Sequence, residues 1–218
     1  MGFARTKDAE TAEMADQAEH WNRIFTGKAD KELGWYEGDV RQTLACIDRI
    51  PCERSQTVFL PGAGTSLLVD ELLARGTRLV LNDISSEALA RLQERIGARG
   101  DRIEWLQQDI SQPLPIGATR ADIWIDRAVL HFLLTEQEID GYFGNVRTVV
   151  KRGGHVLLAE FSETGALRCA GLDVHRYSVD EMRARLGRGF ELLWAEDYVF
   201  INPAGAPRPY VYALFQRN

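Results

Sequence analysis

Two glycines and two aspartates stand where a small molecule could be bound. Gly62 and Gly64 separate an apolar run at 57–60 from an apolar helical pattern, which places both on a strand-to-helix turn. Asp83 ends the next apolar run, 21 positions after Gly62, and Asp109 ends the third. Glycine lets a ligand approach the backbone where a side chain would collide with it. The Asp83 carboxylate can accept hydrogen bonds from both hydroxyl groups of a ribose. The Asp109 carboxylate can accept a hydrogen bond from an amine such as that of adenine.

Each of these residues also has a purely structural explanation. A tight turn can use glycine for its backbone alone, and an aspartate that ends a strand is often a turn former or helix cap. Their joint occurrence favours a binding site. In the dinucleotide motif G-x-G-x-x-G a third glycine would fall at position 67, where this chain has Leu67. The sequence therefore argues against a phosphate-binding dinucleotide turn.

The elements that position these residues alternate along the chain. Apolar runs predict strands, helical periodicity predicts helices at about 66–75 and 86–97, and two capping boxes, Thr135 with Glu138 and Ser178 with Glu181, begin two more helices. The strands are expected at 57–60, 78–82, 102–108, 121–125 and 153–161. This alternation predicts a doubly wound α/β fold, a parallel sheet with helices on both faces.

The C-terminal part breaks the alternation. Residues 190–202 and 208–217 are both strand-like, and only the turn-rich segment 203–207 lies between them. Because a parallel connection needs a longer crossover, the two strands must pair antiparallel. We therefore expect a Rossmann-like, mostly parallel seven-stranded sheet with a C-terminal antiparallel hairpin, which differs from the six parallel strands of dinucleotide dehydrogenases.

Two amphipathic helices precede the first strand. One has Trp21, Ile24 and Phe25 on a single face, and the other has apolar residues at 40, 44 and 47. Between them, Trp35 lies in a short loop bracketed by glycines, as in a lid over a small-molecule site. We expect a single domain over 1–218, with 1–54 a helical lid or cap segment and 55–218 the α/β core.

Composition limits the partners. The net charge is −6 and the isoelectric point about 5.3, which disfavours nucleic acid and acidic membranes. The chain contains no apolar run of about 18 residues, and its first twenty residues lack the apolar core of a secretion signal, so we expect a cytoplasmic protein. Cys46, Cys52 and Cys169 have the spacing of neither a disulfide framework nor a zinc site, and we expect reduced thiols and no metal.

Four segments resemble the successive cofactor motifs of class I S-adenosylmethionine-dependent methyltransferases. They are VFLPGAGTS, LVLNDIS, LQQDI and DIWIDRAVLHFL, and the resemblance runs over most of the chain from about residue 20. It implies S-adenosyl-L-methionine as cofactor and S-adenosyl-L-homocysteine as product. The cofactor-binding residues that it implies are Trp21, Phe25, Trp35, Leu60, Gly62, Gly64, Asp83, Ile84, Asp109, Ile110 and Asp126.

Within that superfamily the chain resembles the thiopurine S-methyltransferase branch. Pro61 stands just before the glycine turn, and the fourth strand ends in Asp126, Arg127 and Ala128, as in that branch. The chain departs from it at Asp83, where the branch favours glutamate. This resemblance implies a small-molecule acceptor with a thiol or another soft nucleophile.

Two residues after the fourth strand are candidates for catalysis. Methyl transfer is an in-line displacement, so alignment of the reacting atoms supplies much of the rate. Arg127 could lower the pKa of an acceptor thiol, or it could pair with an acid on a neighbouring helix. His131 could take a proton from a less acidic acceptor, or it could be a packed, hydrogen-bonded histidine. Trp21 and Trp35 could face the sulfonium, although the stripe that contains Trp21 also fits a core.

The leading interpretation is a methyltransferase that acts on a small molecule. A protein methyltransferase, a nicotinamide-dependent oxidoreductase and a non-enzymatic relative of the same fold remain as alternatives. We expect the segment 169–178, between the fifth strand and the last helix, to be a loop on the substrate side.

Overall fold

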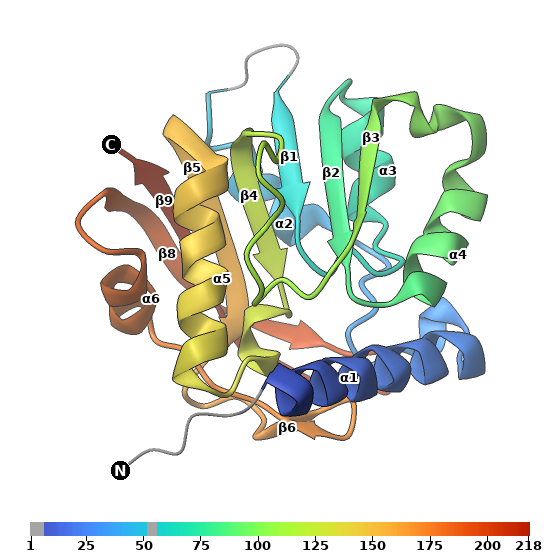
Figure 1. Ribbon diagram of the computed structural model, residues 1–218. Helices are drawn as coiled ribbons and strands as arrows, with labels where there is room; N and C mark the ends of the chain where they lie inside the picture. Colours follow the sequence, from blue (N-terminus) through green and yellow to red (C-terminus); the bar gives the residue numbers. More distant parts are fainter. Residues whose placement is uncertain (1–6, 52–55) are drawn as a thin grey trace.

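The computed structural model describes residues 7–51 and 56–218, with side chains from residue 16 onward. Cys52 and the expected boundary between residues 54 and 55 lie outside the described residues. A central sheet is covered by helices on both faces, and α1 (Lys7–Gly27) runs across the end of the sheet (Figure 1).

The main sheet has seven strands, and its order explains the two parts of the sequence pattern. Strands β1 to β5 are parallel, and β9 pairs antiparallel with both β5 and β8. The mostly parallel sheet with a C-terminal antiparallel hairpin is therefore confirmed. In spatial order the strands are β3 (Ile103–Gln107), β2 (Arg78–Asp83), β1 (Thr57–Leu60), β4 (Ala121–Arg127), β5 (Val150–Phe161), β9 (Pro207–Arg217) and β8 (Phe190–Ile201).

A second, two-stranded sheet lies in the segment expected to be a loop. Strands β6 (Arg168–Cys169) and β7 (Leu172–Asp173) form a small hairpin. Its two turn residues, Ala170 and Gly171, both have positive φ, 53° and 82°, as tight hairpin turns require. Cys46 and Cys169 are free thiols.

The helices begin close to where the sequence signals predict. Thr135 and Glu138 form the expected capping box of α5. The box of α6 is only half formed, because Ser178 accepts the Glu181 N–H while the Glu181 carboxylate binds His175 and Arg185. Besides α1, the helices are η1 (Asp30–Glu32), α2 (Arg41–Ile47), α3 (Leu68–Ala74), α4 (Ser86–Ile96), η2 (Gly97–Arg102), η3 (Leu130–Phe132), α5 (Glu136–Val149) and α6 (Val179–Leu186).

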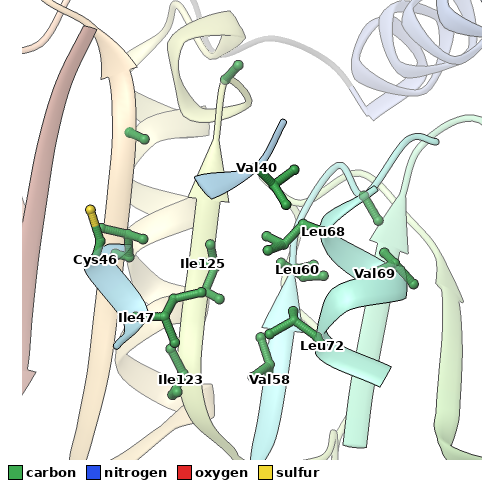
Figure 2. Close-up of a cluster of buried hydrophobic side chains, with 14 of the residues drawn as sticks. Val40, Cys46, Ile47, Val58, Leu60, Leu68, Val69, Leu72, Ile123 and Ile125 are labelled. Atoms are coloured by element: carbon green, nitrogen blue, oxygen red, sulfur yellow. The ribbon is translucent and has the colours of Figure 1, made fainter. Parts of the chain in front are cut away.

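Alternate residues of the inner strands supply two separate cores. On one face, strand residues pack against α2 and α3; Figure 2 shows Val40, Cys46, Ile47, Val58, Leu60, Leu68, Val69, Leu72, Ile123 and Ile125 in this core. On the other face, Phe59 stacks on Trp124 at 4.3 Å between ring centroids, and Trp124 Nε1 donates to Tyr142 of α5. Such burial on both faces fixes the central strands and hence the positions of the loops at their ends. No helix within 7–51 and 56–218 combines the length and hydropathy needed to span a bilayer.

Candidate functional site

A cavity of about 100 Å³ lies at the carboxyl ends of β1, β2, β3 and β4. In open α/β sheets ligands bind at this edge, because loops after neighbouring parallel strands converge there. The lining comes from five stretches of the chain, namely Gln17, Trp21, Phe25 and Trp35; Gly62 and Gly64; Asn82, Asp83 and Ile84; Gln108, Asp109 and Ile110; and Arg127, Ala128, Val129, Phe132 and Leu133. Nine of the eleven residues expected to bind the cofactor are in this set.

The glycine turn has backbone conformations that side chains disfavour. Gly62 and Gly64 have φ of 49° and 53°, in the left-handed region. A Cβ at Gly62 would lie 2.4 Å from Val129 Cγ2, and one at Gly64 would lie 3.4 Å from Phe25 Cζ. A Cβ at Gly62 would clash with Val129, so close packing of the turn requires glycine there. At Gly64 a Cβ would make an ordinary contact with Phe25, and the positive φ is what favours glycine.

Asp83 ties the second strand to the glycine turn. Its Oδ2 accepts the Gly64 N–H at 2.8 Å, and its Oδ1 accepts the Ser85 N–H at 2.8 Å. Burial raises the pKa of the Asp83 carboxyl to about 6, although the N–H groups of Ser85 and Gly64 favour its charged form. The carboxylate is held in one orientation at the cavity, with lone pairs left for further donors.

Asp109 occupies the equivalent place after the third strand. Its side chain is mostly buried, and Oδ1 accepts the Ser111 N–H at 2.8 Å. Ile84 and Ile110 each follow one aspartate and line the cavity. Each aspartate therefore stands beside an apolar side chain, a combination that suits a polar, flat ring system.

Aromatic side chains close the cavity on the N-terminal side. The ring of Trp21 contacts those of Trp35 and Phe132 edge to face, with centroids 5.6 and 4.9 Å apart. Phe25 contacts Trp35 in the same manner at 6.2 Å. These rings join α1, the loop at 33–40 and the segment after β4 into one wall.

Helix α1 is anchored to the start of α4. Asn22 Oδ1 accepts the hydroxyl of Ser85 at 2.7 Å and the N–H of Glu87 at 3.3 Å. At the other end, Arg91 donates to the carbonyl oxygens of Phe25 and Lys28. α1 thus supplies polar partners to the N-terminus of α4, where N–H groups lack partners within the helix.

Arg127 holds the loop that carries Trp35. Its Nε lies 3.0 Å from Glu37 Oε2, and its Nη1 donates to the Trp35 carbonyl at 3.1 Å. The guanidinium also lies over the rings of Phe200 and Tyr210. The two charged side chains are only 12% and 9% exposed, and burial raises the pKa of the Glu37 carboxyl although Arg127 opposes this. Arg127 therefore pairs with an acid, which lies on the loop rather than on a helix.

Three expected site residues lie outside the cavity. Leu60 belongs to the core and lines a smaller cavity of about 70 Å³ on the other side of the glycine turn. Asp126 and His131 are 0% exposed. Burial lowers the pKa of the His131 imidazole to about 3 and keeps the ring neutral. In this conformation its ring cannot take a proton from a molecule in the cavity.

Several lining residues were absent from the sequence expectations. Asn82 donates from its side chain to the carbonyls of Leu106 and Gln108, which joins β2 to the loop after β3. An asparagine beside Asp83 at a strand end was a usable signal. Val129 and Phe132 carried none, because apolar residues after a strand are equally typical of core.

The sequence matches a known family over the part that holds most of the site. A family described as "Methyltransferase domain" matches residues 58–154. Among curated proteins, the chain is 24% identical over 160 residues to the eEF1A lysine and N-terminal methyltransferase of Mus musculus. That match covers 70% of this chain and 22% of the relative, so the chain spans about a fifth of that protein's length.

Solved structures show the same fold. One, described as converting a disulfide bond into a thioacetal group during echinomycin biosynthesis, has a TM-score of 0.73, 15% identity and coverage of 92% of this chain and 93% of that one. Another is the 1,6-didemethyltoxoflavin-N1-methyltransferase of Burkholderia thailandensis with bound 1,6-didemethyltoxoflavin and S-adenosylhomocysteine. Its TM-score is 0.66 at 17% identity, over 100% of this chain and 92% of that one. The nicotinamide-dependent alternative is not favoured. The chain therefore has the Rossmann-like α/β fold of these solved structures, and its residues 58–154 match a methyltransferase domain.

Proposed function

We propose that this protein transfers the methyl group of S-adenosyl-L-methionine to a small-molecule acceptor. The observation that carries the proposal is the placement of Gly62, Gly64, Asp83 and Asp109 around one cavity, beside an aromatic wall. A small-molecule methyltransferase with S-adenosylhomocysteine bound, described above, has the same fold over the whole length of this chain. The net charge of −6 disfavours nucleic acid as the partner, and the cytoplasm is the proposed place of action.

The residues at the strand ends bind different parts of the cofactor. Asp83 accepts the ribose hydroxyl groups with lone pairs that Gly64 and Ser85 leave free, and Asp109 accepts the adenine amine through Oδ2. Ile84 and Ile110 pack against the base. The backbone of the glycine turn binds the methionyl part, near the positive end of the following helix.

Aromatic faces and alignment serve the transfer itself. The rings of Trp21 and Trp35 attract the sulfonium cation, and the leaving group needs no proton. The chain's part in the reaction is to hold the acceptor in line with the methyl group and to exclude water. Residues 1–54 are the proposed lid, with the Trp35 loop as its inner edge.

The finer form of the proposal is a thiol or another soft nucleophile as acceptor, as in the thiopurine S-methyltransferase branch. Arg127 supports it, because Nη2 is buried and is without a hydrogen-bond partner among the described residues. A guanidinium at the edge of the cavity favours the thiolate, which is the reactive form of a thiol.

Thermal unfolding tests the cofactor. S-adenosylhomocysteine at about 100 times its dissociation constant should stabilise the protein by about 2.7 kcal/mol, which raises the midpoint by roughly 5–10 °C for a chain of this size. S-adenosylmethionine should do the same, whereas NAD and NADP should leave the midpoint unchanged. A shift with a nicotinamide nucleotide, or with none of the four, would contradict the cofactor assignment. Methyl transfer to proteins but not to thiols, hydrosulfide or selenols would contradict the acceptor class.

The change of cofactor affinity at acidic pH tests the proposed role of Asp83 in binding the ribose. Its charged form accepts ribose hydroxyls, and burial raises its pKa to about 6. Affinity for S-adenosylhomocysteine should therefore fall as the pH drops below about 6, by up to about tenfold per pH unit. Titration calorimetry between about pH 5 and pH 7 measures this. Asp83→Asn should bind more weakly and lose the acid dependence, and an unchanged profile in that variant would assign the dependence to another group.

A further inference from the structure

Two carboxyl groups of the core have no role in the site described so far. Asp126 ends β4, and Glu160 lies near the end of the neighbouring strand β5. Both side chains are 0% exposed. A buried carboxylate is costly unless it is hydrogen-bonded or protonated, so the partners of these two groups define their state.

Asp126 binds the segment that follows it. Its Oδ1 accepts the Val129 N–H at 3.1 Å, and its Oδ2 accepts the Leu130 N–H at 3.2 Å. The hydroxyl of Tyr142, on α5, donates to the same Oδ2 at 2.5 Å. Asp126 is therefore bound from both the segment after β4 and the covering helix.

Glu160 accepts the next backbone N–H group of the same segment. Its Oε2 accepts the backbone N–H of His131 at 3.2 Å and lies 2.7 Å from the His131 Nδ1. The neutral imidazole donates from Nδ1, since Oε2 already acts as an acceptor. Three successive backbone N–H groups, of residues 129, 130 and 131, thus end on two carboxyl groups.

The two carboxyl groups also affect each other. They bind the adjacent N–H groups of Leu130 and His131, and besides burial the charge of Glu160 helps to raise the pKa of the Asp126 carboxyl. Glu160 Oε1 is buried and has no hydrogen-bond partner in the described part of the chain, so it is the oxygen on which a proton avoids a buried, unpaired charge. Burial raises the pKa of Glu160 to about 8 and that of Asp126 well above its ordinary value.

The groups around Asp126 and Glu160 offset little of the negative charge that the two carboxylates would carry if both were ionised. Arg127 on β4 is the nearby cation, His131 on η3 is neutral, and Tyr142 on α5 has its pKa raised by burial. Tyr177, which precedes α6, has a buried hydroxyl whose pKa is raised by burial and by the charges of Glu160 and Glu181, while Arg185 lowers it. Two like charges cannot both be ionised here without a large penalty, so one proton is shared.

The segment held in this way is one wall of the cavity. Ala128 has φ of 70°, a conformation that residues with a side chain rarely adopt. Val129 fills the space beside Gly62, and Phe132 contacts Trp21. The hydrogen bonds to the acid pair maintain this turn and its apolar side chains against the glycine turn.

We propose that Asp126 and Glu160 are positioning residues that share one proton and hold residues 128–133 as the wall of the cofactor cavity. Loss of this proton at alkaline pH places two negative charges side by side, loosens the wall and weakens cofactor binding. The identity of the ligand rests on the proposed function, but the shared proton does not. His131 then acts through Glu160 and not as a base.

The alkaline side of the binding profile tests the proposal. Wild-type affinity for S-adenosylhomocysteine, measured by calorimetry from about pH 7 to about pH 10, should fall up to tenfold per pH unit above about pH 8. Glu160→Gln keeps the shape, donates its amide N–H to Asp126 and accepts from His131 without a titrating proton, so its affinity should fall over this range by no more than titration of the ligand's own amino group accounts for. The matched control Glu163→Gln removes an exposed carboxyl that follows the same strand and should keep the wild-type profile. A flat wild-type profile, or the wild-type slope in Glu160→Gln, would overturn the proposal.

Infrared spectroscopy of the wild-type protein without cofactor gives a second measurement that needs no variant. A protonated carboxylic acid has its own carbonyl stretching band, which should be present at neutral pH and lost on alkaline titration while circular dichroism shows that the fold persists. Absence of the band at neutral pH would refute the shared proton. If the band is present but S-adenosylhomocysteine does not bind, the proposed function fails and the acid pair stands.

Discussion

Gly64→Asp is expected to weaken binding of S-adenosylhomocysteine at least about 100-fold, a loss of roughly 2.7 kcal/mol. The backbone at this position has φ of 53°, and its N–H donates to Asp83 Oδ2. A new carboxylate would lie close to that of Asp83 in a buried site, and its Cβ would already contact Phe25 at 3.4 Å. Charge repulsion and the added bulk both act at the turn assigned to the methionyl part. Titration calorimetry near pH 7 measures the effect.

A matched control separates this effect from backbone strain. Gly117 also has positive φ, 84°, and a Cβ there would meet no atom within 4 Å. Gly117→Asp therefore carries a similar conformational penalty away from the cavity and should bind with wild-type affinity. Normal affinity in Gly64→Asp would mean that the cofactor binds elsewhere.

Arg127→Ala is expected to destabilise the protein by about 3 kcal/mol, as measured by urea unfolding near pH 7. The substitution leaves Glu37, 9% exposed, without its cation, and removal of one partner of a buried ion pair typically costs 3–5 kcal/mol. It also frees the Trp35 carbonyl, so the loop loses its anchor. Methyl transfer should then fall more than cofactor affinity, because the loop places Trp35 beside the sulfonium and closes the cavity, while the cofactor contacts at the strand ends remain.

A double variant shows whether the pair itself is responsible. Glu37→Gln removes the uncompensated charge, so Arg127→Ala combined with Glu37→Gln should recover part of the lost stability. Wild-type stability in Arg127→Ala would exclude the stabilising role of Arg127, and wild-type activity would exclude its role in methyl transfer. If the double variant is as unstable as the single one, the lost packing on Phe200 and Tyr210 accounts for the effect.

The order of the helices and strands could be predicted from the sequence because most of them show an apolar run, a helical period or a capping motif. Strands β1 to β5 are apolar runs between turn residues, and the Thr135 capping box marks the start of α5. Strands β6 and β7, two residues each, are too short for any periodicity to be read. The capping box of α6 was only half right, since Glu181 has stronger partners in His175 and Arg185 than in a backbone N–H.

Within the site, position along the chain was a better guide than residue type. The glycines and aspartates at strand ends line the cavity because parallel strands end at one edge. Asp126 and His131 have side chains suited to chemistry, but both are completely buried and bind groups of the core, His131 to Glu160 and Asp126 to the backbone that follows it. Glu160 itself was a missed signal, a charged residue inside the apolar run of β5. No local pattern could have paired Glu37 with Arg127, which lie far apart in the sequence and meet only in the fold.

The strand order has a consequence for how this protein folds. β9 lies between β5 and β8, so the last strand enters the interior of the sheet (Figure 1). Until it does, β5 presents an unpaired edge with a run of apolar side chains, which is the kind of edge that recruits other chains. Insertion of β9 pairs residues that lie far apart in the sequence, such as His155 and Gln216. Such long-range pairing is a slow step in the folding of a sheet. Aggregation should therefore compete with closure during refolding, and dilution should raise the yield of native protein.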